Sequence, residues 1–474
     1  MRCSRFFMFL ALWLLCSLFF LLYWIDKNFG IVTFDQLLFH LKMEAAGVVD
    51  VDPKLVRNFL RGVVFWPLVI VIACWGGAYW LAGENRVRRL MRTRNFIFAL
   101  GAWLLIFAHQ FGFASYLTQP LKEDFFSPNY IDPRSVSIDM SNGRSLLLIY
   151  VESLESAYSD KNIFGKDLLS PLSVERRGGL SFKRLEQMPG ASWTIASVVS
   201  SQCGLPLKSM MLFDGNKQGQ NLASYLPGAQ CLGDVLKAHG YRNIFLNGPD
   251  LSFSGMGLFF SSHGYGETIG RAEWLERGYS REDMNGWGLY DRDLFKETRL
   301  ALDGLMAKNT PFNLTVLTID AHGPEGFLSE SCVRSGFVGG FESVLECSVH
   351  DLASLLDYID KKGWRDRLTV VVVGDHLAMK NPVSDKLEKS GYRSVFNAIY
   401  QSDLNPSREV VNNFDLFPTV LASMGARING GRLGLGFAGV GPDAENPPEN
   451  WQDELKEKVL NNSSMYDSLW FSGK

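Results

Sequence analysis

Hydrophobic residues are distributed unevenly along the 474-residue chain, and most of the long apolar runs lie within the first 120 residues. Residues 6–25 carry no charge, and the runs 62–82 and 96–117 are similar in length and apolar character. A helix of about 20 residues, rising 1.5 Å per residue, spans a hydrocarbon core of about 30 Å. The pattern therefore predicts three transmembrane helices in a membrane domain of residues 1–118.

The charges that flank these runs predict how the chain crosses the bilayer. The first run can also be interpreted as a signal peptide, but no small-x-small cleavage pattern follows it before Asp26, which favours an uncleaved anchor. Arg2, Arg5 and the arginines between residues 86 and 94 indicate a cytoplasmic location for both stretches. Three crossings would then place the rest of the chain on the periplasmic or extracellular side of a bacterial cytoplasmic (inner) membrane, as a multi-pass protein.

A short helical pattern lies between the first two apolar runs. Phe34, Leu37, Leu38 and Leu41 recur at helical spacing. Such a helix either lies in the membrane interface or packs on the outer domain.

The remainder of the chain alternates between strand and helix patterns. Residues 119–144, with several Pro, Asn and Gly, read as a linker, and residues 145–440 alternate short β-branched runs with helical patterns. This alternation predicts an α/β sandwich with a largely parallel sheet. Residues 441–474 are rich in Asn, Glu and Ser and are expected to form a peripheral helix or a loose tail. The strands are expected at residues 145–151, 243–246, 312–319 and 368–373, and the helices at 232–239 and 349–361.

Charge and cysteine content narrow the possible partners and the compartment. The formal net charge is only -3 and the outer domain has no long basic tract, so nucleic acid is not an expected partner. Four cysteines of the outer domain can form two disulfides in an oxidising space. The pairing Cys203–Cys231 with Cys332–Cys347 encloses the shortest loops, and two other pairings are possible.

Polar side chains follow three of the expected strands at the point where each ends. These are Glu152, the segment Asp320-Ala-His322, and Asp375-His376. In open sheets of this kind, ligands bind beyond the carboxyl ends of the strands. The three segments are therefore expected to meet in one site.

Asp375 and His376 are the strongest indication of a metal site. A carboxylate and an imidazole side by side can both reach one ion if the chain turns, which Gly374 permits. A structural Asp that caps the next helix is the alternative. Glu152 ends a buried strand, where its carboxylate needs a cation, an arginine or the sheet edge to offset the cost of burial. A helix-capping role is the alternative for Glu152.

Thr194 is the candidate nucleophile. It follows Pro189-Gly-Ala-Ser-Trp193 and precedes an apolar segment, so it is expected in the first turn of a helix. The positive end of the helix dipole would stabilise its alkoxide and an incoming phosphate. An ordinary N-cap threonine is the alternative. His322 can hydrogen-bond a phosphate oxygen or protonate a leaving alkoxide, and Asp320 can orient it or cap the next turn.

These motifs resemble those of the membrane phosphoglycerol transferases of the alkaline phosphatase superfamily, which include lipoteichoic acid synthase and the phosphoglycerol transferase of periplasmic glucans. The resemblance is closest in Val151-Glu-Ser-Leu-Glu155, in Pro189–Pro206 and in Asp375-His-Leu-Ala-Met-Lys-Asn381, and the glucan type is the nearer of the two. It departs from the lipoteichoic type at Leu251–Gly257, which contains neither the Trp nor the Arg expected there.

The resemblance implies an alkaline-phosphatase-like, or sulfatase-like, catalytic domain. It implies that Glu152, Thr194, Asp375 and His376 hold one divalent ion, most naturally Mn²⁺, with Mg²⁺ or Zn²⁺ as alternatives. It further implies that Thr194 is the nucleophile, that His322 contacts the phosphoglycerol, that phosphatidylglycerol is the donor and that a glycan or polysaccharide is the acceptor.

Three other functions are compatible with the same motifs. A phosphoethanolamine transferase also uses a threonine and a membrane anchor, and a phosphodiesterase or sulfatase-like hydrolase would use water as the acceptor. The sequence Cys203-Gly-Leu-Pro does not fit the C/S-x-P-x-R motif of arylsulfatases. The third alternative is a membrane scaffold that has kept the fold without the chemistry.

Overall fold

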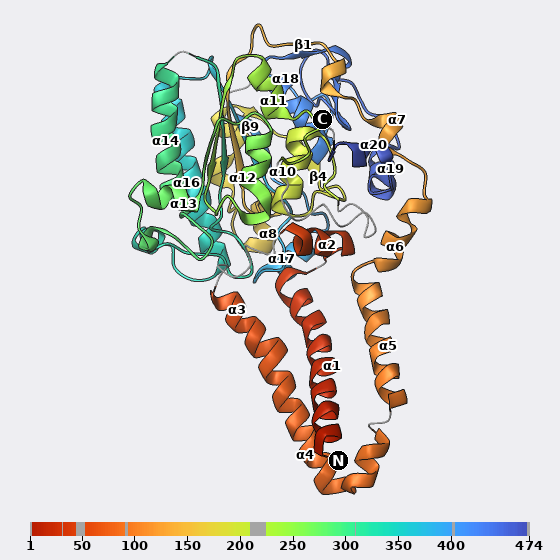
Figure 1. Cartoon of the computed structure of the whole chain (residues 1–474). Helices are drawn as coiled ribbons and strands as arrows, with labels where there is room; N and C mark the ends of the chain where they lie inside the picture. Colours follow the sequence, from red (N-terminus) through yellow and green to blue (C-terminus); the bar gives the residue numbers. More distant parts are fainter. Residues whose placement is uncertain are drawn as a thin grey trace. The chain divides into compact units, whose positions relative to one another are not determined.

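The computed structural model describes residues 2–30, 32–43, 53–90, 93–208, 224–308, 310–400 and 403–471. The chain divides into two compact units, one of Met1–Leu38 with Val48–Thr118 and the other of Phe39–Gly47 with Gln119–Lys474. We call them the membrane unit and the globular unit (Figure 1).

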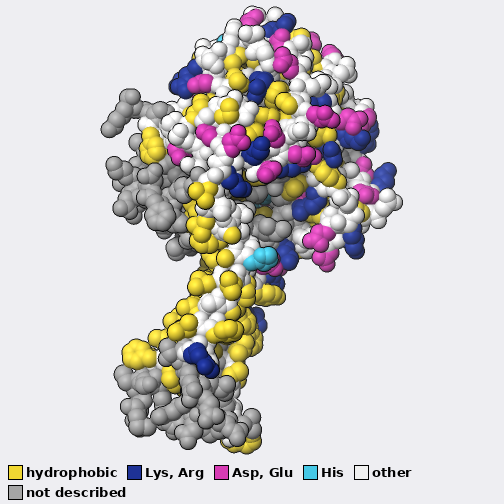
Figure 2. All heavy atoms as spheres, turned by 90° about the vertical axis from the view of Figure 1, so that its right-hand side faces the viewer, with side chains coloured by type: hydrophobic (Ala, Val, Ile, Leu, Met, Phe, Trp, Pro, Cys, Tyr) yellow, Lys and Arg dark blue, Asp and Glu magenta, His cyan; other side chains and the backbone are white. Residues whose placement is uncertain are grey.

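The membrane unit is helical. Among the described residues, two segments are long and apolar enough to span a bilayer, Phe6–Phe29 and Leu55–Gly77. Hydrophobic side chains cover its described surface in Figure 2, whereas charges of both signs are scattered over the globular unit. The helices up to residue 118 are α1 (Arg2–Phe29), α2 (Phe34–Met43), α3 (Pro53–Phe59), the π-helical turn η2 (Leu60–Phe65), α4 (Trp66–Leu90), α5 (Thr93–Gln110) and α6 (Phe113–Thr118). The part of α2 from Phe39 onward is grouped with the globular unit.

The third predicted span, residues 96–117, is not confirmed, because the helix is divided. Helix α5 ends at Gln110 and α6 begins at Phe113, with Gly112 between them at a φ of 64°. The 18 residues of α5 extend for about 27 Å at 1.5 Å per residue, slightly less than a hydrocarbon core of about 30 Å.

The helical pattern that begins at Phe34 forms α2 as predicted. Phe34 and Leu38 are buried against Leu22, Phe111 and Tyr116. The Phe34 backbone N–H donates to the Phe111 carbonyl at 2.7 Å. This face of α2 therefore belongs to the apolar core of the membrane unit.

The globular unit contains a seven-stranded sheet in the order β3-β9-β8-β2-β7-β5-β6. Strand β9 is antiparallel to both of its neighbours, and the other pairs are parallel, so the sheet is mixed but largely parallel, as predicted. The strands are β2 (Ser145–Val151), β3 (Gly179–Leu180), β5 (Arg242–Asn247), β6 (Glu267–Ile269), β7 (Phe312–Leu317), β8 (Leu368–Gly374) and β9 (Asn397–Tyr400).

Helices cover both faces of this sheet, because alternate side chains of its central strands point in opposite directions. Along β2, Leu146, Leu148 and Tyr150 join one apolar core, and Leu147, Ile149 and Val151 join the other. Figure 1 shows α14 and α16 on one side of the sheet and α10, α11, α12 and α18 on the other. These helices are α10 (Thr194–Cys203), α11 (Leu232–Ala238), α12 (Met256–Ser262), α14 (Asp291–Ala307), α16 (Phe341–Lys362) and α18 (Leu416–Ser423).

The two ends of the globular unit pack into the first of these cores. Phe125 and Phe126 of the expected linker are buried there together with Trp451 and Tyr466 of the expected tail. Shorter elements near the chain ends are α7 (Phe126–Asn129), β1 (Ile138–Asp139), β11 (Arg427–Ile428), α19 (Trp451–Lys458) and α20 (Ser464–Ser468).

Two disulfides join segments of the globular unit. Cys203 is bonded to Cys231, and Cys332 to Cys347, which confirms the pairing with the shortest loops. The first bond joins the end of the helix that begins at Thr194 to the residue before α11.

Candidate active site

The candidate site lies where β8, β2 and β7 end side by side. Strands β2 and β8 are parallel neighbours, with Val151 opposite Gly374, so the residues that follow them, Glu152 and Asp375, are adjacent. Gly374 is needed here because of a close backbone contact, not because the chain turns. A Cβ at this position would lie 2.0 Å from the carbonyl oxygen of Leu154, so only glycine allows the two strand ends to approach this closely.

Glu152, Asp375 and His376 are all buried and face one another. The Nε2 atom of His376 lies 3.3 Å from Asp375 Oδ2 and 3.9 Å from Glu152 Oε1. Its Nδ1 atom is 2.8 Å from the carbonyl oxygen of Leu377. Because a carbonyl can only accept, Nδ1 carries a proton, and Nε2 is the ring atom that faces the two carboxylates and is available to bind a cation.

The Thr194 hydroxyl completes the group. Thr194 is the first residue of α10 and is half-buried. Its Oγ1 lies 3.4 Å from His376 Nε2. The N-cap position belongs to Trp193, so Thr194 is not the N-cap threonine of the alternative interpretation.

The four side chains fit a small divalent cation. Glu152 Oε2 and Asp375 Oδ2 are buried atoms without a hydrogen-bond partner. Two atoms that each bind one ion at about 2.1 Å lie at most about 4.2 Å apart, and the three distances from Nε2 satisfy this limit. The other two groups of potential ligands found among the described residues contain cysteines that are already in disulfides.

The electrostatics of the site also favour the binding of a cation. Burial, followed by the charge of Glu152, raises the pKa of Asp375 to about 6. Burial likewise raises the pKa of Glu152. Burial acts to lower the pKa of His376, but the two carboxylates outweigh it, and the pKa is raised. Both acids are therefore poorly stabilised as anions unless a cation lies between them.

Ser153 holds the two carboxylates in place and is not recognisable from the sequence alone. Its N–H donates to Asp375 Oδ1 at 2.8 Å, and its hydroxyl donates to Glu152 Oε1 at 2.6 Å. Its φ is 55°, in the left-handed region that residues other than glycine rarely adopt. These hydrogen bonds stabilise the unusual backbone, as is common at functional sites.

An ion pair between the buried Glu155 and the partly exposed Arg393 fixes the loop that carries His376. Both oxygens of Glu155 accept hydrogen bonds from the Arg393 guanidinium, and Oε1 also accepts from the backbone N–H of Ala378. Glu155 is fully buried. The Leu377 N–H donates to Gln187 Oε1 at 2.7 Å. The segment after β8 is thereby tied to two other parts of the chain.

His322 follows β7, the other neighbour of β2, and is almost fully buried. Its Nδ1 donates to the Gly323 carbonyl at 3.0 Å, and its ring packs against Trp287. The backbone at Gly323 faces the Lys380 carbonyl, since a Cβ there would lie 3.5 Å from it. The His322 loop is therefore next to the loop that follows His376.

Asp320 does not act as a simple turn cap. Its Oδ1 accepts from the Asn285 side chain at 2.9 Å, and its Oδ2 accepts from the Asp291 backbone N–H at 3.1 Å. Asp320 thus holds the segment between Asn285 and Asp291, which contains Trp287.

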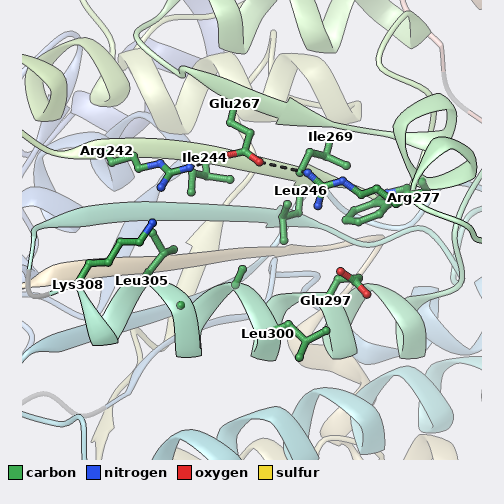
Figure 3. A pocket seen from close by; sticks show the side chains of 13 residues that line it. Arg242, Ile244, Leu246, Glu267, Ile269, Arg277, Glu297, Leu300, Leu305 and Lys308 are labelled. Carbon is green, nitrogen blue, oxygen red and sulfur yellow. Dashed lines mark hydrogen bonds and ion pairs between the residues drawn. The ribbon is translucent and has the colours of Figure 1, made fainter.

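A separate hollow of about 290 Å³ lies between β5, β6 and α14, away from these strand ends (Figure 3). Its floor is apolar, and Glu267 on its rim pairs with Arg242 at 2.8 Å and with Arg277 at 3.2 Å. None of the candidate site residues lines it.

Comparison with known proteins agrees with the fold. Residues 144–426 match the family described as Sulfatase. The chain belongs to the sulfatase family. The matched segment includes all five candidate site residues, from Glu152 to His376. Cys203 is bonded to Cys231 in a disulfide, so it is not a free thiol.

Relatives of the chain include phosphoglycerol transferase I of Escherichia coli. It is 35% identical over 301 residues, which cover 62% of this chain and 38% of the relative. The chain therefore spans well under half the length of that relative. The resemblance to phosphoglycerol transferases seen in the motifs is confirmed.

Solved structures of low sequence identity share the fold. The lipoteichoic acid synthase LtaP of Listeria monocytogenes superposes with a TM-score of 0.50 at 14% identity, over 72% of this chain and 97% of that one. The integral membrane lipooligosaccharide phosphoethanolamine transferase A of Neisseria meningitidis gives a TM-score of 0.51 at 15% identity, over 88% and 83%. A protein of the alkaline phosphatase superfamily from Vibrio parahaemolyticus gives a TM-score of 0.51 at 18% identity, over 75% of this chain and 95% of that one, so the α/β fold is alkaline-phosphatase-like.

Proposed function

We propose that this protein transfers phosphoglycerol from phosphatidylglycerol to a hydroxyl group of an extracytoplasmic glycan, through a phosphoglyceryl-threonine intermediate, and releases diacylglycerol. The observation that carries the proposal is the position of Thr194. Its hydroxyl lies at the start of a helix, 3.4 Å from His376 Nε2 and beside two buried, unpartnered carboxylate oxygens. The similarity to phosphoglycerol transferase I supports the choice of donor.

Glu152, Thr194, Asp375 and His376 are the proposed ligands of one divalent cation, with Mn²⁺ preferred and Mg²⁺ or Zn²⁺ also compatible with oxygen and nitrogen donors. Such a cation would neutralise the buried carboxylates and offset the negative charge of the transferred phosphate. The partial positive charge at the start of α10 acts on the same phosphate.

The proposed reaction has two steps. In the first, the Thr194 oxygen loses its proton and bonds to phosphorus, the bond from phosphorus to the diacylglycerol oxygen breaks, and that oxygen gains a proton. In the second, the acceptor hydroxyl loses its proton and its oxygen bonds to the same phosphorus, the bond from phosphorus to the Thr194 oxygen breaks, and that oxygen gains a proton, which restores the Thr194 hydroxyl. His322 contacts the phosphoglycerol and is the candidate proton donor.

The membrane unit would keep the site close to its lipid donor. We propose a multi-pass protein of the bacterial inner membrane, with the globular unit, from about residue 119, on the periplasmic or extracellular side. The two apolar helices support the membrane location. The two disulfides support an oxidising compartment for the globular unit.

Mass spectrometry of the covalent intermediate tests this proposal directly. The full chain, purified in detergent and supplied with Mn²⁺, is incubated with phosphatidylglycerol without an acceptor. We expect one added phosphoglycerol on the peptide that contains Thr194. Labelling by phosphatidylethanolamine instead would indicate phosphoethanolamine transfer. Release of free glycerol phosphate as fast as diacylglycerol would indicate hydrolysis. Absence of bound metal and of any adduct would leave only a scaffold.

A further inference from the structure

The imidazole of His322 is restrained on two sides. Its ring centroid lies 4.3 Å from that of Trp287, with the two planes inclined by 45°. On the other side, Nδ1 donates to the Gly323 carbonyl. A histidine held by a backbone hydrogen bond and an aromatic contact has a defined ring orientation, with Nε2 directed away from Gly323.

The segment that carries Trp287 is itself rigidly attached. Asn285 donates to Asp320 through its side-chain nitrogen and accepts, through Oδ1, from the backbone N–H groups of Trp287 at 2.8 Å and Gly288 at 3.0 Å. Gly288 lies so close to the Gly248 carbonyl that a Cβ would come within 1.9 Å of that oxygen. The position of the indole is therefore set by buried contacts on both sides of it.

Asp320 links the two aromatic residues. It lies two residues before His322 along the chain, and its two carboxylate oxygens hold Asn285 and the Asp291 backbone, which bracket Trp287. Asp320 and Asn285 are both buried. The buried carboxylate of Asp320 thus fixes the segment that carries the indole relative to the segment that carries the imidazole. A loop on the protein surface does not need such a set of buried hydrogen bonds.

We propose that Trp287 is a positioning residue for the transfer reaction, and that it acts by holding His322 in the orientation in which Nε2 meets the phosphoglycerol. This inference rests on the proposed function, because it requires His322 to contact the transferred group. Trp287 acts on the substrate through His322 and leaves the metal site unaffected.

Kinetics of diacylglycerol release from phosphatidylglycerol, with the full chain in detergent, test the inference. Replacing the indole by a non-aromatic side chain, Trp287→Leu, should lower kcat/KM about 3- to 10-fold, the range expected from loss of one aromatic pair. Trp287→Phe keeps a ring and should recover most of the loss. Trp364→Leu is the matched control, since Trp364 is also a half-buried indole but lies in the turn between α16 and β8.

A double-mutant cycle separates positioning from a general structural effect. In a His322→Gln background, Trp287→Leu should cause little further loss, because its effect passes through the imidazole. Equal losses in both backgrounds, or unchanged kinetics in Trp287→Leu, would overturn the inference. If the unaltered protein releases no diacylglycerol, the proposed function itself fails, and that outcome is distinct from either of these.

Discussion

The Thr194 hydroxyl and the His376 Nε2 atom lie 3.4 Å apart although 182 residues separate them along the chain. The contact exists because β8 ends next to β2 in the sheet and α10 begins beside these strand ends. The first consequence concerns the hydroxyl itself. Thr194→Ala should abolish phosphoglycerol transfer, because alanine has no oxygen to bond to phosphorus.

The threonine variants should remain folded. Thr194→Ser keeps the oxygen but loses the methyl group that limits its rotation, so a small residual rate is expected. Thr310→Ala, at an exposed position, serves as the control and should transfer at the normal rate. Diacylglycerol release, measured beside the melting temperature of each variant, checks this prediction. Full activity in Thr194→Ala would reject the mechanism.

Metal removal should destabilise the globular unit. Glu152 and Asp375 are buried like charges, and a ligand that binds only the folded state adds about 2.7 kcal/mol of stability at a concentration 100 times its Kd. Adding Mn²⁺ to chelator-treated protein should therefore raise the melting temperature, as followed by calorimetry.

The rise in melting temperature with Mn²⁺ should disappear when one of the proposed metal-binding side chains is replaced. Asp375→Ala should show no rise with Mn²⁺, whereas Asp303→Ala, which alters a half-exposed carboxylate paired with Lys362, should respond like the unaltered protein. A normal Mn²⁺ response in Asp375→Ala would mean that the ion binds elsewhere.

The sequence predicted much of the site because its residues stand at the ends of unambiguous strands. Residues 145–151 were expected as a strand and form β2 with those bounds, and the expected strand 368–373 forms β8. Glu152 and Asp375 come directly after these two strands. Since parallel strands end at the same side of a sheet, a largely parallel sheet is enough to bring the two residues close together.

Other features depend on contacts that no local pattern reveals. Strand β9 runs against its neighbours although its sequence, Asn397–Tyr400, resembles any buried strand. The third apolar run looks continuous, but Gly112 interrupts its helix. The ring contact between Trp287 and His322 depends on hydrogen bonds from Asp320 to a segment about 30 residues earlier in the chain. A single sequence cannot show such a pairing.

The Glu155–Arg393 pair should be essential for stability. Glu155 is fully buried, and removal of its cation in Arg393→Met would leave an unpaired charge, which typically costs about 3–5 kcal/mol. The exposed pair Arg427–Asp443 offers a matched comparison, since Arg427→Ala should cost much less stability than Arg393→Met.

Denaturant unfolding of the two variants checks this difference. Adding Glu155→Gln to Arg393→Met removes the buried charge and should recover part of the lost stability. Similar small losses in both single variants would show that the buried pair is not the anchor of the His376 loop.

Asp291 should make stability depend on pH in an unusual direction. It is buried, and this burial raises its pKa to about 6, from an ordinary value near 3.8. The folded protein therefore binds a proton more tightly than the unfolded chain does. The stabilisation is complete below the ordinary pKa and is lost as the pH rises through the raised pKa of the folded state.

Asp291→Asn should flatten this part of the pH profile. The amide oxygen can still accept from the Ile319 and Asp320 backbone N–H groups, and the amide nitrogen can donate to the Ser348 hydroxyl, so the local contacts are preserved. The free energy of unfolding, measured between pH 4 and pH 7, should fall less steeply with pH in Asp291→Asn than in the unaltered protein. Asp403→Asn, at a carboxylate that is 92% exposed, should leave the slope unchanged. An identical slope in Asp291→Asn would mean that another acid carries the extra proton, because only a group whose pKa differs between the folded and unfolded states contributes to that slope.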